Sequence, residues 1–184
     1  MPRFTVLLSV FAVVLLTGVA VAAPLPVIAQ EATPAAGDGI TITGEVSAPG
    51  VLTLDDLRAL PVETVEVTYE TGGAAATHTF IGVRLIDVVN TVGLAGDPAD
   101  PDSRLRLYLV LTARDDYQVV LSVGELEPLL GDAPMLLAWE RDGAPLPPTH
   151  APLQLVGPGD LIDSRYIWGI TSIEVRSIAD PGSA

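Results

Sequence analysis

The stretch from Met135 to Val175 constrains the fold more than any other part of this 184-residue chain. Its centre, Pro145 to Pro152, holds four prolines in eight residues. Proline lacks the backbone N–H and restricts the residue before it, so this centre cannot be helical. A tight turn is expected just before it, at Arg141-Asp142-Gly143, and apolar runs occupy 135–139, 153–156 and 169–175. The order of these segments predicts three strands that are joined by a turn and two loops.

The two loops of this stretch carry most of its polar side chains. His150 lies on the proline-rich loop, and the next loop contains Asp160, Asp163, Arg165 and Tyr166. Polar groups on stiff loops between buried strands are a common way to build a site for a small molecule. We therefore expect a binding site at these loops, if the chain has one.

The rest of the chain mixes strand patterns with short helical patterns. Thr53 with Asp56, and Ser122 with Glu125, have the spacing of capping boxes at helix starts. Gly82 is expected to end the strand that precedes the second helix. The predicted strands are 40–46, 65–69, 78–81, 105–113 and 117–121, and the predicted helices are 53–60, 85–92 and 123–130. Because strands and helices do not alternate as β-α-β units, the predicted fold class is α+β, mostly β-strands with short helices.

The N-terminal residues have the pattern of an export signal. An apolar run follows Arg3, and Ala20-Val21-Ala22 has the small-x-small form of a signal-peptidase site. The apolar run approaches the length that spans a membrane, so an uncleaved membrane anchor remains an alternative to a signal peptide. We predict a signal peptide or anchor at 1–22, a flexible linker at 23–39, a folded domain at 40–178 and a tail at 179–184. Either form places the domain outside the cytoplasm, as a secreted, periplasmic or cell-surface protein.

Charge and composition exclude several classes of function. The formal net charge is -14, and all nine basic side chains are arginine. An acidic surface disfavours nucleic acid and anionic membranes as partners, which leaves a small-molecule ligand or a protein partner, with membrane contact only through an uncleaved N-terminal segment. The chain contains no cysteine, so disulfides, thiolate metal ligands and cysteine nucleophiles are all excluded.

Few residues have the chemistry of a catalytic centre. The sequence contains two histidines and no P-loop, HExxH or GxSxG motif. His78 is expected to be a partly exposed strand residue, whereas His150 is the stronger functional candidate. Residues 95–103 contain three aspartates but lack the glutamate and glycine of a calcium loop, so we predict a solvated loop and no metal site. Trp139 and Trp168 are expected to pack in the core or at its edge.

Several short motifs follow one another in an order that is informative as a set. They are Gly44-Glu45-Val46, Pro49-Gly50, Leu52 to Leu57, Leu60-Pro61, Phe80 to Val83, Leu85 to Val88, Gly93, Asp116-Tyr117, Ser122, Leu136 to Ala138, Asp142-Gly143, Pro145-Leu146, Pro152 to Val156, Pro158 and Trp168 to Val175. With these motifs, the region from about Ile40 to Arg176 resembles the oxidoreductase molybdopterin-binding domain family, the fold of sulfite-oxidase-type enzymes. The resemblance implies that fold and makes molybdopterin the candidate cofactor.

The resemblance also identifies a departure from the family pattern. Catalytic members hold molybdenum with a cysteine thiolate, on the loop after a strand that resembles 65–69 of this chain. Here the residues that follow are Glu70, Thr71 and Gly72. Glu70 or Thr71 would have to provide a hard oxygen ligand in place of the soft thiolate. The family's redox chemistry would therefore need a different metal site in this chain.

The same resemblance places the family's cofactor between the loop after Tyr69 and the loops around His150 and 160–166. The family tends to have an arginine where this chain has Gln154, so an anionic pterin would depend on the remaining cations, which are Arg141, Arg165 and Arg84, and above all on Arg165. Arg165 could instead pair with Asp160 or Asp163. The candidate cofactor-binding residues are Glu70, Thr71, Gly72, His150, Gln154 and Arg165.

Three hypotheses about function follow from these observations. The first is an exported, non-catalytic or cofactor-poor relative that binds a small ligand or a protein partner. The second is an active molybdopterin-dependent oxidoreductase with a non-cysteine metal site. The third is a hydrolase built around His150 and nearby aspartates.

Overall fold

Ten strands, three α-helices and two short 3₁₀ helices make up residues 39–97 and 100–178, the part of the chain that the computed structural model describes. The dominance of strands confirms the predicted α+β fold class. The predicted export signal, the tail and all of the predicted linker except Gly39 lie outside the described residues. No helix within the described ranges is long and apolar enough to cross a membrane.

The first sheet has five strands in the order β2-β1-β10-β5-β6. The strands are β1 (Gly39–Gly44), β2 (Gly50–Thr53), β5 (Leu107–Ala113), β6 (Gln118–Ser122) and β10 (Ile170–Ser177). Only β1 and β10 pair in parallel, and the other neighbours are antiparallel. The strand predicted at 40–46 corresponds to β1, which ends two residues earlier than predicted. The sequence did not predict β2.

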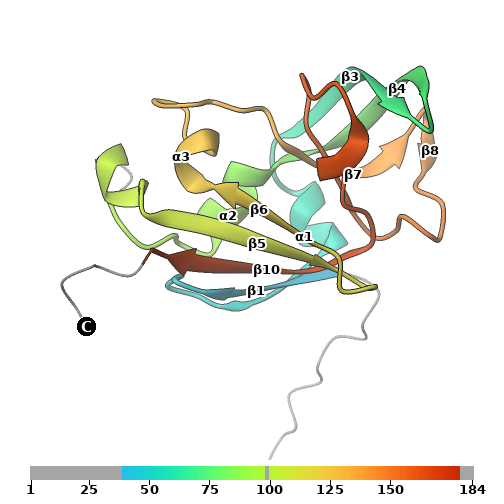
Figure 1. Cartoon of the computed structure of the whole chain (residues 1–184). Helices are drawn as coiled ribbons and strands as arrows, with labels where there is room; N and C mark the ends of the chain where they lie inside the picture. Colours follow the sequence, from blue (N-terminus) through green and yellow to red (C-terminus); the bar gives the residue numbers. More distant parts are fainter. Residues whose placement is uncertain (1–38, 98–99, 179–184) are drawn as a thin grey trace, which may run out of the picture. The chain divides into compact units, whose positions relative to one another are not determined.

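The second sheet contains the stretch that opened the sequence analysis. Its strands are β3 (Val62–Thr71), β4 (Ala74–Arg84), β7 (Leu136–Arg141) and β8 (Ala144–Pro145), with β9 (Gln154–Val156) paired to β7. Figure 1 shows β3, β4, β7 and β8 together, apart from the layer of β1, β5, β6 and β10. β7 and β8 meet at a tight turn in which Asp142 and Gly143 both have positive φ, so the predicted turn is confirmed.

The helices are short, and their ends have local causes. In α1 (Leu54–Arg58), Thr53 accepts from the backbone N–H of Asp56 and the Asp56 carboxylate accepts from that of Thr53, which confirms the first capping box. α3 (Val123–Leu126) is shorter than predicted, and the Ser122 side chain does not cap it. Glu127 is extended because it precedes a proline, which disfavours helical backbone. The remaining helices are α2 (Leu85–Thr91), η1 (Pro101–Arg104) and η2 (Asp163–Arg165).

Gly82 does not end its strand, contrary to the sequence prediction. It lies inside β4, where the pairing with β7 shifts register between Ile81 and Gly82. A Cβ atom at this position would lie 2.2 Å from the carbonyl oxygen of Leu137. Glycine is needed here because the backbone of β7 approaches closely, which is another usual reason for glycine in a strand.

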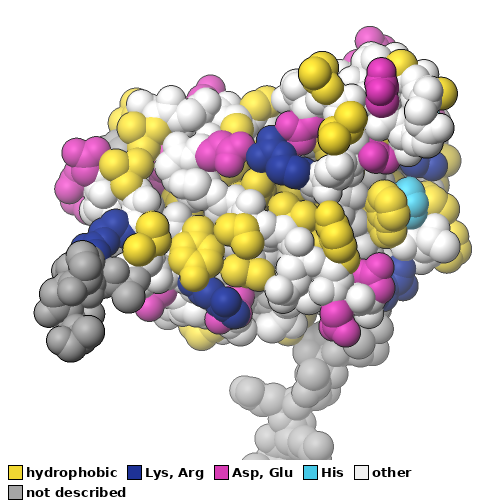
Figure 2. All heavy atoms as spheres, viewed as in Figure 1, with side chains coloured by type: hydrophobic (Ala, Val, Ile, Leu, Met, Phe, Trp, Pro, Cys, Tyr) yellow, Lys and Arg dark blue, Asp and Glu magenta, His cyan; other side chains and the backbone are white. Residues whose placement is uncertain are grey.

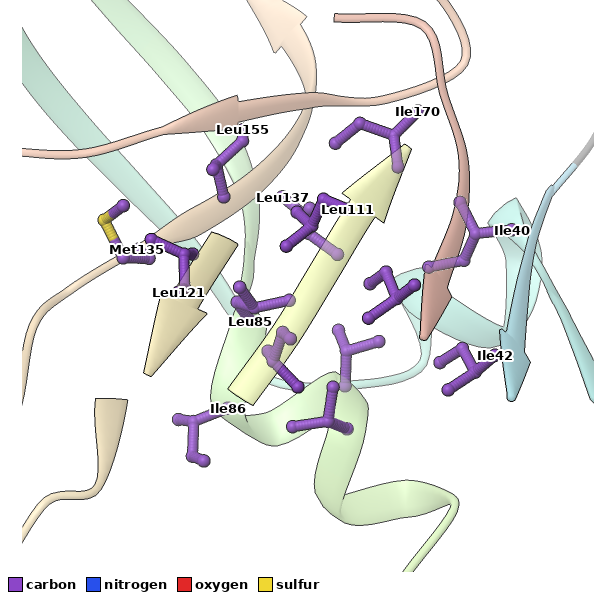
Figure 3. Close-up of a cluster of buried hydrophobic side chains, with 14 of the residues drawn as sticks. Ile40, Ile42, Leu85, Ile86, Leu111, Leu121, Met135, Leu137, Leu155 and Ile170 are labelled. Atoms are coloured by element: carbon purple, nitrogen blue, oxygen red, sulfur yellow. The ribbon is translucent and has the colours of Figure 1, made fainter. Parts of the chain in front are cut away.

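The main core fills the space between the two sheets. Figure 3 shows apolar side chains from both sheets and α2 pointing toward one another, among them Ile40 and Ile42 from β1 and Leu137 from β7. A second, smaller cluster lies on the other face of the second sheet and contains Val67, Tyr69, Phe80, Leu136, Ala138, Val156 and Tyr166. Leu136 and Leu137 face opposite clusters because side chains alternate along a strand. The second cluster anchors the segment that contains η2 through Tyr166.

Candidate functional site

A cavity of about 270 Å³ lies between the turn that joins β5 to β6 and the segment that contains η2. Its lining residues come from these two segments, which are about fifty residues apart in the sequence: Ala113, Asp115, Tyr117, Asp163, Ser164, Tyr166, Ile167 and Trp168. Three of these side chains are aromatic and two are carboxylates. The cavity is smaller than the pockets of roughly 300–1,000 Å³ that hold drug-sized ligands, so it suits a small ligand.

Hydrogen bonds hold the two walls of the cavity together. Arg114, in the β5–β6 turn, donates its backbone N–H to the carbonyl oxygen of Gly169 at 3.0 Å. The Tyr117 hydroxyl donates to the carbonyl oxygen of Ser164, also at 3.0 Å. The turn itself closes through Asp116, whose backbone has a φ of 65°, a conformation that aspartate tolerates better than most residues. The walls are therefore fixed by contacts that do not need a ligand.

Trp168 forms an aromatic wall of the cavity, and it is not part of the core. Its exposed fraction is 42%, so of the two predicted positions, in the core or at its edge, the core is wrong for this tryptophan, whereas it is confirmed for the buried Trp139. The imidazole of His150 stacks on the indole with ring centroids 4.6 Å apart and an interplanar angle of 6°. The residue before Trp168, Ile167, is buried instead.

His150 is held by groups on both sides of its loop. Its backbone N–H donates to Pro147, and its carbonyl oxygen accepts from Gly169. Its Nδ1 lies 3.1 Å from Oε1 of Gln154, which is buried in β9. Burial lowers the pKa of His150, and the hydrogen bond to Gln154 only partly opposes that effect. Among the described residues no carboxylate or serine hydroxyl hydrogen-bonds this ring, so the contacts do not support a hydrolase triad.

Tyr166 forms the inner wall of the cavity. Its side chain is buried, and its hydroxyl donates to the carbonyl oxygen of Gly157 at 2.8 Å. Its ring packs edge-on against Tyr69, with centroids 4.7 Å apart. Burial and the nearby Asp160 carboxylate raise the pKa of Tyr166 to about 12, so the phenol stays protonated at neutral pH. Tyr166 is thus a neutral, fixed residue behind the cavity, and its ring is almost wholly buried.

The charged groups at the cavity are acidic. Asp115 accepts a hydrogen bond from the backbone N–H of Tyr117, and neither Asp115 nor Asp163 forms an ion pair within the described ranges. Among the residues that the structure describes, no basic side chain lines the cavity. The neighbouring guanidinium of Arg114 points to the carbonyl oxygens of Pro148 and Thr149, to which it donates at 2.9 and 3.0 Å.

Arg165 lies in the segment that lines the cavity, but its guanidinium binds carboxylates elsewhere. It makes two hydrogen bonds to Asp160, at 2.7 and 3.1 Å, and one to Glu125 at 2.9 Å. These bonds raise its pKa well above the usual value for arginine, with Asp160 as the larger cause. The pairing with Asp160 that the sequence left open is therefore present. Of the other two candidate cations, Arg84 pairs with Asp132 at 2.7 Å, and Arg141 acts electrostatically on Tyr69 and on His150.

The predicted site residues fall into three places. His150 and Gln154 contact each other behind Trp168, and Arg165 lies at η2. Glu70, Thr71 and Gly72 are exposed and lie at the tip of the β3–β4 hairpin. Glu70 connects to the η2 segment only through its backbone, which donates to the carbonyl oxygen of Leu161 and pairs with Ile162.

The cavity therefore has one of the two predicted walls. The loop around 160–166 contributes to it as expected, but the opposite wall is the β5–β6 turn and not the loop after Tyr69. The residues that sequence reasoning missed are Asp115 and Tyr117. An acidic turn followed at once by an aromatic residue was the available signal. Within the described residues, no group of three or more histidine, aspartate or glutamate side chains is arranged to hold a metal ion.

Comparisons with known proteins agree with this architecture. The sequence model of the family described as "oxidoreductase molybdopterin binding domain" matches residues 31–182. Among solved structures, the sulfane dehydrogenase SoxCD from Paracoccus pantotrophus is similar, with a TM-score of 0.61 and 17% sequence identity. That likeness covers 78% of this chain and 39% of the other, and at such identity it concerns the fold alone. No curated protein matches the chain significantly.

Proposed function

Since the chain belongs to the oxidoreductase molybdopterin-binding domain family, we propose that it is an exported member that binds a small ligand and does not perform molybdenum redox chemistry. The export part of the proposal rests on the apolar N-terminal run and on the alanine-rich residues that follow it. The ligand-binding part rests on the cavity between the β5–β6 turn and the η2 segment.

The residues at this cavity do not fit the family's cofactor. A pterin phosphate is anionic and is best bound by free arginine guanidinium groups. Here the lining groups that carry charge are Asp115 and Asp163, and Arg165 is neutralised by two carboxylates. Two carboxylates would repel the phosphate across a small cavity. This acidic lining is the observation that carries the proposal.

The position of the metal ligand in the family gives independent support. A thiolate cannot be supplied, because the chain has no cysteine. Glu70 and Thr71 would have to replace it, and both are exposed at a hairpin tip. A catalytic metal site needs ligands that converge and a second shell that orients them. The described contacts of Glu70 are backbone contacts to Leu161 and Ile162. These contacts bring no second metal ligand to the Glu70 carboxylate and no second shell that would orient it.

Metal analysis of the protein, purified from its native compartment, tests the proposal. We expect molybdenum well below one atom per chain, with normal cooperative unfolding. Stoichiometric molybdenum that is lost in Glu70→Ala or Thr71→Ala would instead establish the oxidoreductase with an oxygen-ligated metal. The matched control is Glu66→Ala, an exposed carboxylate on the same strand.

A further inference from the structure

We propose that the ligand of the cavity is a small organic cation, such as a quaternary ammonium or alkylamine compound. This inference rests on the proposed ligand-binding function and specifies its chemistry. It is argued from the charge of the cavity, from its aromatic walls and from its size.

The charge of the cavity selects for a cation. Asp115 and Asp163 both line it, and neither has an ion-pair partner in the described part of the chain. Two carboxylate residues that line one small volume without an ion-pair partner lower the electrostatic free energy of a positive guest. The guanidinium groups nearest in sequence, Arg114 and Arg165, donate to carbonyl oxygens and carboxylates outside the lining. The net charge of -14 would also attract cations over longer distances.

The aromatic walls favour an organic cation over a metal ion. Tyr117, Tyr166 and Trp168 line the cavity together, and tryptophan and tyrosine rings attract cations through their negative π faces. Tyr117 and Trp168 are 52% and 42% exposed, so their rings remain available to a guest. A hard metal ion would need several oxygen ligands, whereas an alkylammonium group gains from ring faces and carboxylates together.

The walls are preorganised, which reduces the entropic cost of binding. His150 stacks on one face of the Trp168 indole, and the hydrogen bond from Tyr117 to Ser164 fixes the second ring. The imidazole adds no competing charge near neutral pH, because burial lowers the pKa of His150. The volume of about 270 Å³ accommodates a small organic cation. Figure 2 shows hydrophobic, acidic and basic side chains interspersed on the face in view.

A titration of the full chain with choline and tetramethylammonium tests the inference. Amide and indole NMR shifts report where each probe binds, and sodium chloride at equal ionic strength controls for non-specific charge effects. We expect saturable shifts at Ser164, Ile167 and the Trp168 indole. Neohexyl alcohol, in which carbon replaces the choline nitrogen, should bind at least about tenfold more weakly, because it has the shape without the charge.

Variants separate the local charges from the overall acidity. Asp115→Asn and Asp163→Asn should each weaken choline binding about tenfold, because each removes one negative charge beside the ammonium group. Asp116→Asn removes the same charge one residue away, outside the lining, and should leave the affinity within about twofold. Trp168→Leu should weaken choline binding because the aromatic ring is removed. Trp168→Phe should retain most of the affinity because it keeps an aromatic ring. Unchanged amide spectra outside the cavity confirm that each variant is folded.

Several outcomes would overturn the inference. They are equal binding of neohexyl alcohol and choline, equal effects of Asp115→Asn and Asp116→Asn, and the lack of saturable shifts with either cation. Preferential binding of the neutral alcohol would show that the ligand is not a cation, while the proposed ligand-binding function would stand. Stoichiometric molybdenum would overturn the proposed function whatever the choline result.

Discussion

At the scale of single residues, His150 connects the loop, the aromatic wall and the buried amide of Gln154. Because burial lowers its pKa in the folded protein, the unfolded chain takes up a proton first as the pH falls. Above about pH 6.5, the ordinary histidine pKa, both states are neutral and His150 contributes no pH dependence. Below that value, the free energy of unfolding should fall until the lowered folded-state pKa is reached.

We therefore predict that the His150 ring protons titrate with a midpoint below about 6.5 in the folded protein. His150→Gln should reduce the loss of melting temperature on acidification, since glutamine keeps a polar side chain and has no proton to gain. Proton NMR and thermal unfolding at a series of pH values measure the two effects. A ring midpoint at or above about 6.5, or an unchanged acid dependence in the variant, would contradict the prediction.

Loop residues were the hardest to place from the sequence, and Trp168 and Arg165 show why. The size of Trp168 predicts a position in the core or at its edge. In the structure it stacks on His150, which lies eighteen positions away in the sequence. The sequence alone predicts that Arg165 binds an anionic ligand. In the fold, Glu125, which is forty positions away, binds its guanidinium group instead. Such partners are set by the tertiary fold, and no local periodicity encodes them. Asp160, five residues from Arg165, was the partner that could be foreseen.

At the scale of elements, the turn of the β7–β8 hairpin allows the effect of backbone conformation on stability to be measured without a change in side-chain packing. Gly143 has a φ of 77°, and no atom lies within 4 Å of the position where a Cβ would be. Gly50, in β2, also has open space there, but its φ is not positive. We predict that Gly143→Ala lowers the free energy of unfolding by about 1 kcal/mol, because L-residues are strained in that region.

The matched variant Gly50→Ala should leave the stability unchanged or raise it by a few tenths of a kcal/mol, through a smaller entropy of the unfolded chain. Urea unfolding of both variants, compared with the wild type, measures the difference. Equal effects of the two substitutions would show that the hairpin does not depend on the left-handed conformation of Gly143.

Local signals located the elements better than they located the element ends. The Asp-Gly turn and the capping box of Thr53 were predictable because each depends on residues within one turn. α3 is shorter than predicted because the proline after Glu127 outweighs the helical pattern. β2 has four residues and no alternation strong enough to recognise, and it forms because β1 offers it a paired edge. Element ends therefore reflect competition between local preference and pairing.

At the scale of the whole molecule, the first sheet depends on a strand close to the start of the described residues. β1 lies between β2 and β10, and it pairs with both. Its side chains Ile40 and Ile42 are fully buried in the main core, where Figure 3 shows them beside β10. Burial of two isoleucine side chains is worth about 3–6 kcal/mol, a large share of a typical stability of about 5–15 kcal/mol.

We predict that a truncated chain that begins at Gly39 unfolds cooperatively, with a melting temperature close to that of the full chain, because every described contact of β1 is kept. A chain that begins at Gly44 lacks Ile40 and Ile42 and leaves the pairing edges of β2 and β10 empty, so its cooperative transition should be lost. Calorimetry of the two truncated chains beside the full chain measures the difference. A lost transition in the longer truncation would mean that residues before Gly39 stabilise the domain, whereas a retained transition in the shorter one would mean that β1 is dispensable.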